Sequence, residues 1–275
     1  MNNLILTNPS RKMEQAMKLI GQFGGAALVL SDSQDVGCLN PCKSLDVLEF
    51  TEKDTTSRLN PWRCPDFYIY CYNEWAKDIS GLFCQAYGLP KSCWKVLENA
   101  ILAIGKPDLT TFETIRDQVA LQADLADNRY LFVMRSLESV LEDPVLYRMF
   151  CCKPERERNP LVFHSCLQYL ENSHDLGLVQ VKIHEKIDQK AKRFLQGVLA
   201  HFGGLYGGMK NILIDKADTG YFADRFFYGT AGMMSHSPFE KIALNAIHFD
   251  KQLLLLCEDP EALPGFVQKY SYHLC

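Results

Sequence analysis

The sequence lacks an apolar run approaching the roughly 20 residues that span a bilayer. One of its longest apolar runs, KQLLLLCED at 251–259, has the length of a strand. The N-terminus MNNLILTNPSRK also lacks a basic segment followed by an apolar one, so we expect no signal peptide. These absences predict a cytoplasmic protein without a membrane span, which would reach the inner membrane only through partners.

Excess positive charge is also missing. The net charge is −4, the isoelectric point is near 6.0, and lysine and arginine are dispersed along the chain. Nucleic-acid binding generally needs a basic patch or stripe. The charge pattern therefore argues against DNA or RNA as a partner.

Paired cysteine motifs are absent although the chain has eleven cysteines. Structural zinc sites use two ligand pairs at short spacings, and no CxxC occurs here. The cysteines are scattered through apolar segments, so we expect most to be buried thiols in a reducing compartment. No metal site is predicted.

Signatures of common hydrolases are missing as well. The sequence has no HxxxH, HxH or HExxH pattern and no GxSxG turn for a nucleophilic serine. No catalytic residue is assigned on these grounds.

What the sequence does have is a strand, loop, helix and strand at its start. Residues 4–7 are apolar, residues 12–23 carry apolar side chains at helical spacing, and AALVLSD at 26–32 is a continuous apolar run. Such a run is typical of a strand buried on both faces of a parallel sheet. VLEFT at 47–51 is a predicted third strand.

The middle of the chain is predicted to be helical. Two prolines interrupt the pattern at 59–67, and helical periodicity then dominates over 72–150. Thr110 or Thr111, followed by Glu113 or Thr114, resembles a capping box at the start of one helix.

An aromatic group precedes and enters these helices. We expect it to pack in a core, with one exposed patch for a partner. Its members are Trp62, Phe67, Tyr68, Tyr70, Tyr72 and Trp75.

Strands and helices alternate again after the helical stretch. Strands are predicted at 176–184 and 209–218, a helix at 186–202, and a final strand followed by the start of a helix within 245–263. The fold class is therefore α/β, a mostly parallel sheet flanked by helices and interrupted by an all-α insertion. The predicted parts are 1–71 and 159–275 for the α/β domain and 72–158 for the insertion.

The loop after the first strand looks like a phosphate-binding loop without its glycines. In GxxxxGK[ST], glycines let backbone amides surround a phosphate, the lysine reaches the outer phosphates and the hydroxyl binds magnesium. With Lys12 aligned as that lysine, Leu6 and Arg11 take the glycine positions and Met13 the hydroxyl position. Pro9 has no amide proton, so several requirements are lost together.

A second nucleotide motif is also incomplete. An apolar strand ending in an acid can hold magnesium, and a following glutamate can orient the attacking water. NILIDKAD at 211–218 supplies Asp215, but Lys216 stands where the glutamate is expected, and Asp218 lies nearby.

In these segments the chain resembles the HerA/FtsK superfamily of RecA-like motor ATPases, in particular the coupling and motor ATPases of conjugation and type IV secretion. The segments are LILTNPSRKM, AALVLSD, VLEFT, LNPW and NILIDKAD. The resemblance implies a RecA-like fold, whereas the missing motif residues imply a pseudo-ATPase rather than an enzyme. Arg11, Lys12, Asp215 and Asp218 are then vestiges of a cofactor site.

We therefore expect a non-catalytic structural or adaptor subunit of a larger bacterial assembly, such as a type IV secretion coupling complex that handles protein substrates. Its partners would be proteins, including a motor ATPase, and no cofactor is expected. One alternative is a weak binder of ATP and magnesium. Another is a small α/β enzyme of unrelated chemistry, with a site near Ser31, Asp32 and Asp215 at the ends of strands.

Overall fold

The chain forms two compact units. Unit 1 comprises residues 1–49, 170–184 and 199–275, and unit 2 comprises residues 50–169 and 185–198. The computed structural model describes residues 4–6, 12–31, 34–40, 44–53, 58–64, 72–105, 110–124, 127–150, 162–163, 177–205, 211–217, 252–257 and 271–273.

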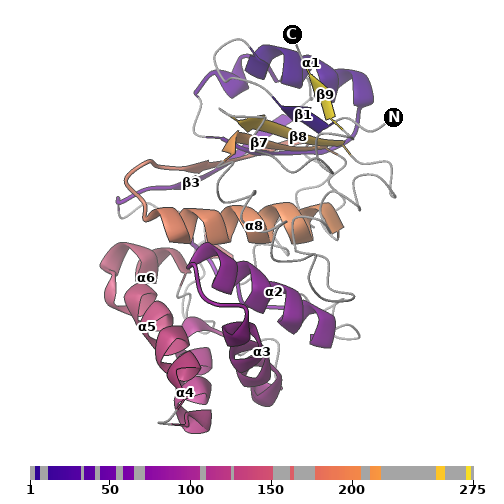
Figure 1. The fold of residues 1–275 in the computed structure, drawn as a ribbon. Helices are drawn as coiled ribbons and strands as arrows, with labels where there is room; N and C mark the ends of the chain where they lie inside the picture. Colours follow the sequence, from indigo (N-terminus) through magenta and orange to yellow (C-terminus); the bar gives the residue numbers. More distant parts are fainter. Residues whose placement is uncertain are drawn as a thin grey trace. The chain divides into compact units, whose positions relative to one another are not determined.

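Unit 1 is built on a seven-stranded sheet with the order β3-β6-β2-β7-β8-β1-β9 (Figure 1). In this order, every two neighbouring strands from β6 through β2, β7, β8 and β1 to β9 are parallel. The mixed α/β class predicted from the sequence is thus confirmed. The strands are β1 (Leu4–Leu6), β2 (Ala27–Leu30), β3 (Ser44–Phe50), β6 (Gly177–Ile183), β7 (Asn211–Ala217), β8 (Gln252–Cys257) and β9 (Ser271–His273).

Helix α1 (Lys12–Phe23) covers one face of this sheet (Figure 1). Met13, Ala16, Met17 and Ile20 follow the helical spacing of one apolar face, and all four are buried. They pack in one core cluster with Ala27 and Val29 of β2, Val36, Leu178 of β6 and Leu213 of β7. The helix therefore joins three neighbouring strands through a single apolar face.

Two glycines end α1 and lead directly into β2. Gly24 and Gly25 both have positive φ, at 72° and 84°, and the amide of Gly24 donates to the carbonyl of Ile20 at 2.9 Å. A side chain would strain the backbone at these angles, so the short connection depends on glycine. A short 3-10 helix, η1 (Gln34–Gly37), follows β2.

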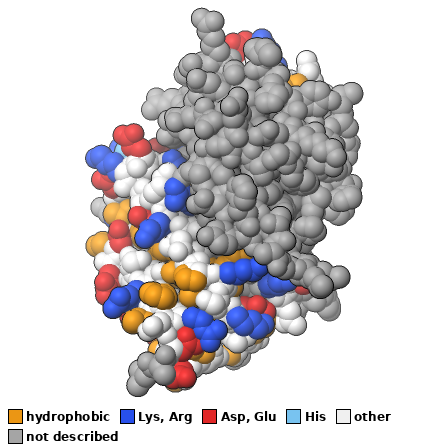
Figure 2. Space-filling view, viewed as in Figure 1, with side chains coloured by type: hydrophobic (Ala, Val, Ile, Leu, Met, Phe, Trp, Pro, Cys, Tyr) orange, Lys and Arg blue, Asp and Glu red, His pale blue; other side chains and the backbone are white. Residues whose placement is uncertain are grey.

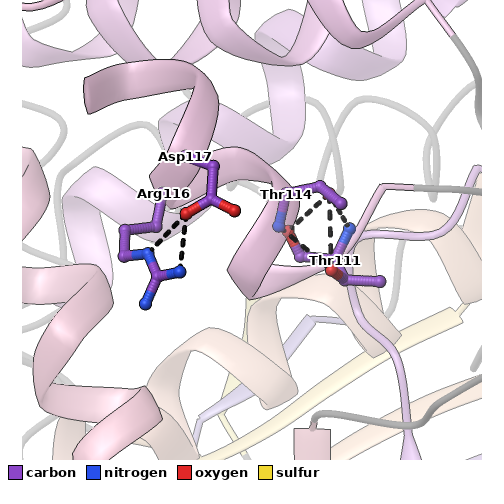
Figure 3. A network of polar contacts seen from close by, with 4 residues as sticks. All are labelled: Thr111, Thr114, Arg116 and Asp117. Carbon is purple, nitrogen blue, oxygen red and sulfur yellow. Dashed lines mark hydrogen bonds and ion pairs between the residues drawn. The ribbon is translucent and has the colours of Figure 1, made fainter. Parts of the chain in front are cut away.

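Unit 2 is mainly helical. Asp127, Asp143 and Asp188 accept amide hydrogen bonds at the starts of α5, α6 and α8. Thr111 and Thr114 form the predicted capping box at α4 (Figure 3). The helices are α2 (Tyr72–Ala86), α3 (Ser92–Ile104), α4 (Phe112–Gln122), α5 (Asn128–Glu142) and α6 (Pro144–Phe150), together with the first part of α8 (Gln189–Leu205).

An aromatic cluster forms the centre of unit 2. The ring of Trp62 lies 5.1 Å from Phe83, 5.3 Å from Phe112 and 5.1 Å from Phe194, measured between ring centroids. All four side chains are buried. The predicted core role of Trp62 is confirmed, and Trp75 is also buried, whereas Phe67, Tyr68 and Tyr70 lie outside the described residues.

The unit boundaries differ from those expected along the sequence. Residues 50–71 and 159–169 belong to the helical unit, and so do residues 185–198. The unit is also not all α, because β4 (Arg58–Leu59) pairs in parallel with β5 (Val162–Phe163). These differences arise from long-range contacts, such as that of Phe194 with Trp62, which periodicity along the chain does not reveal.

No helix among the described residues is long and apolar enough to cross a bilayer.

Two tyrosines of unit 2, Tyr87, which is buried, and Tyr72, which is half-buried, provide a test of its packing. Among the described residues, the buried Tyr87 hydroxyl has no hydrogen-bond partner, and burial raises the pKa of this group. The Tyr72 hydroxyl instead donates to the carbonyl of Ile101 at 3.0 Å. Tyr87→Phe should therefore raise the free energy of unfolding by about 1 kcal/mol, and Tyr72→Phe should lower it by about 1 kcal/mol.

Urea denaturation of both variants measures this difference. A loss of stability in Tyr87→Phe as large as that in Tyr72→Phe would contradict the assignment of an unpaired hydroxyl.

Candidate functional site

The candidate site lies at the carboxyl ends of the parallel strands in unit 1. From β1 the chain passes through α1 to β2, on one side of β1 in the sheet. The next described strand after β8 is β9, on the other side of β1. The connections that leave the neighbouring strands β1 and β8 thus lead to opposite sides of the sheet order. In open α/β sheets, ligands bind outside the carboxyl ends of the strands at such a point.

Strand register places one predicted residue at this edge. Leu6 of β1 pairs with Leu255 of β8, which pairs with Ile214 of β7, which in turn pairs with Leu30 of β2. These residues form one row across the sheet. Asp215 is the residue after Ile214, so it lies one residue beyond this row. The chain also continues beyond the row after Leu6, the last residue of β1.

The separation between these two features follows from the strand order. β8 alone lies between β1 and β7, so two strand spacings, about 10 Å, separate the start of the loop from Asp215 along the sheet. Lys12 begins α1 after this loop. The fold therefore brings the end of β1 and Asp215 to the same edge, whereas Arg11 and Asp218 lie outside the described residues.

Strand β7 has a bulge at the predicted acid. Ile214 pairs with Leu255 and Ala217 pairs with Cys257, so Asp215 and Lys216 together face a single residue of β8. Such bulges change the direction of side chains and occur often near functional sites. The regular alternation of β7 therefore ends at Asp215.

Met13 is the residue that the sequence alignment with a phosphate loop predicts at the position of the magnesium-binding hydroxyl. Its side chain is only 9% exposed and packs in the core cluster beneath α1. A thioether in an apolar core offers magnesium no oxygen ligand. At this position the structure has a core residue instead of a metal ligand.

Ser31 lies next to Asp215 in the sheet, and it is hydrogen-bonded to Gln180, a residue that the sequence analysis did not single out. Ser31 directly follows Leu30, the partner of Ile214, and so lies next to Asp215 in register. Gln180 of β6 is buried and its side-chain amide donates to the carbonyl of Ser31 at 3.2 Å. The amide of Ser31 donates to the carbonyl of Val181 at 3.1 Å.

Ser31 was a candidate of the unrelated-enzyme alternative, and Asp32 lies outside the described residues. Gln180 was not predicted to matter. Its signal in the sequence is a single amide within the apolar run LVQV. A buried polar group needs a partner, and here that partner is the end of the neighbouring strand.

The described cysteines do not form a metal centre. Cys64, Cys84 and Cys93 are buried, as predicted, whereas Cys38 is exposed. Burial raises the pKa of the Cys84 and Cys93 thiols. Within the part of the chain that the structure describes, no group of three or more histidine, cysteine or acidic side chains could hold a metal ion.

No family model matches this chain, and a search of curated proteins found no relative of significant sequence similarity.

The Gln180 hydrogen bond can be tested by substitution. In Gln180→Leu the carbonyl of Ser31 loses this donor in a buried position, so the free energy of unfolding should fall by about 1–2 kcal/mol. Urea denaturation measures the change. Lys182→Gln, at a half-buried position on the same strand, is the control and should change stability by less than about 0.5 kcal/mol. Equal stabilities of Gln180→Leu and the wild type would show that the bond is not stabilising.

Proposed function

We propose that this protein is a non-catalytic, ATPase-like structural or adaptor subunit of a larger bacterial assembly. The observation that carries the proposal is the burial of Met13 in the core, at the position where an active enzyme needs a magnesium-binding hydroxyl. Lys216 at the position of the catalytic glutamate supports the same conclusion. The protein is accordingly a pseudo-ATPase.

The order of the strands supports a RecA-like ancestry. β8 lies between β1, which precedes the degenerate loop, and β7, which carries Asp215. A mostly parallel sheet that carries both segments is the fold class that the resemblance to HerA/FtsK-type motor ATPases implies. The setting that this ancestry suggests is a type IV secretion coupling complex, in which the subunit would pack on a motor ATPase and help to present protein substrates.

The helical unit offers a surface for such a partner. Leu121 at the end of α4 is 81% exposed, and Leu131 and Phe132 near the start of α5 are also exposed. Figure 2 shows apolar side chains at the surface of this unit among lysine, arginine and acidic groups. Exposed apolar side chains with a charged surround are typical of protein interaction sites.

The position of the protein in the cell follows from this proposal. It would work in the cytoplasm, and it would lie at the inner membrane only where its partners hold it there.

A second candidate is a weak nucleotide binder. It is favoured by the register, which brings Asp215 to the edge where Lys12 begins α1. Here Arg11 and Lys12 would contact phosphates, and Asp215 or Asp218 would support magnesium. An α/β enzyme of unrelated chemistry, with Ser31 and Asp215 side by side, is the third.

Calorimetric titration with ATP and magnesium, combined with a phosphate-release assay, separates these candidates. The adaptor proposal predicts neither binding nor turnover, in the wild type or in Lys12→Ala. Binding without turnover that is lost in Lys12→Ala would favour the second candidate. Turnover that depends on Lys12 would refute the pseudo-ATPase assignment.

The apolar surface of the helical unit predicts a partner contact. The double substitution Leu131→Asp and Phe132→Asp should release the tagged protein from its assembly, because it places two charges in an apolar contact. Size-exclusion chromatography of extracts from its bacterial host gives the elution volume of the tagged chain. Ser139→Asp, at an exposed position of the same helix, is the control and should elute as the wild type does. Co-elution of the double variant with the assembly would exclude this surface as the contact.

A further inference from the structure

Strand β3 forms an edge of the seven-stranded sheet. It follows β6 in the strand order and has no strand on its other side in the part of the chain that the structure describes. Leu45 and Val47 are 36% and 39% exposed, so one face of β3 presents two aliphatic side chains. An edge of seven residues with exposed aliphatic groups is a template for pairing with another chain.

A side chain of the strand itself occupies part of this edge. The backbone amide of Val47 donates to Oδ1 of Asp46 at 2.9 Å. Successive residues of a strand direct their amides alternately to one side and the other. Since β3 has β6 on one side, an amide that bonds to the strand's own carboxylate indicates the side away from β6, which the Leu45 amide shares by alternation.

We propose that Asp46 closes the open edge of β3, so that this strand does not accept a strand from a second copy of the chain. The carboxylate binds the Val47 amide, and a newly arriving carbonyl finds no donor there.

The arrangement of the strand shows why a second copy is the relevant occupant. In an antiparallel pair centred on Val47, the two Val47 side chains would face each other, and Leu45 would face Glu49 of the other copy. The two Val47 side chains would then form an aliphatic pair, which favours association. The carboxylate of Asp46 is the group that opposes it.

Two substitutions on the same strand test the proposal. Asp46→Ala and Glu49→Ala each remove one carboxylate from β3, but only the first removes the acceptor of the Val47 amide. The average mass of Asp46→Ala, from light scattering after size-exclusion chromatography, should rise with concentration to about twice the wild-type value, as for an isologous pair. Glu49→Ala should keep the wild-type mass. Asp46→Asn retains an amide oxygen as acceptor and should also keep it.

A wild-type mass for Asp46→Ala at all concentrations would overturn the proposal. An equal rise in both alanine variants would overturn it as well, because charge alone would then oppose association. Should Asp46→Ala fail to fold by circular dichroism, amide hydrogen exchange of the wild type decides. The Val47 amide should exchange more slowly than the Leu45 amide, and equal rates would contradict a closed edge.

Discussion

The packing of α1 on the sheet is the contact on which unit 1 depends. Its apolar face, from Met13 to Ile20, joins the strands β2, β6 and β7 in one core cluster. The same contact determines what the amino-terminal end of the helix can do chemically. A residue that fills the core at Met13 cannot also ligate magnesium, so this one position can serve either the core of the unit or a metal ion.

Much of the local structure follows from periodicity in the sequence. The helix over 12–23 was predicted with its observed bounds because four apolar side chains recur at helical spacing and two glycines follow. Strand β2 was predicted from its continuous apolar run, and its residues are all buried. The capping box at Thr111 was also predictable, since the hydroxyl and its amide partner are close in sequence.

Contacts between distant residues were not predictable in this way. Phe194 belongs to a helix that follows strand β6, yet its ring packs against Trp62 in unit 2. The hydrogen bond from Gln180 to Ser31 joins residues 149 positions apart. In the candidate site, Asp215 was identified from its place at the end of an apolar strand. That it lies one residue beyond the row of Leu6 across the sheet depends on the strand register, which one sequence does not reveal.

The bulge in β7 has a consequence for how this edge of the sheet can change in evolution. Two residues of β7 share one position of β8, so the strand already contains one residue more than a regular ladder requires. Loss of that residue would convert the bulge to regular pairing while the register from Asn211 to Ile214 stayed as it is. Strand length can thus vary here without a change in the core, and the residues that face the edge can be exchanged at little cost to the fold.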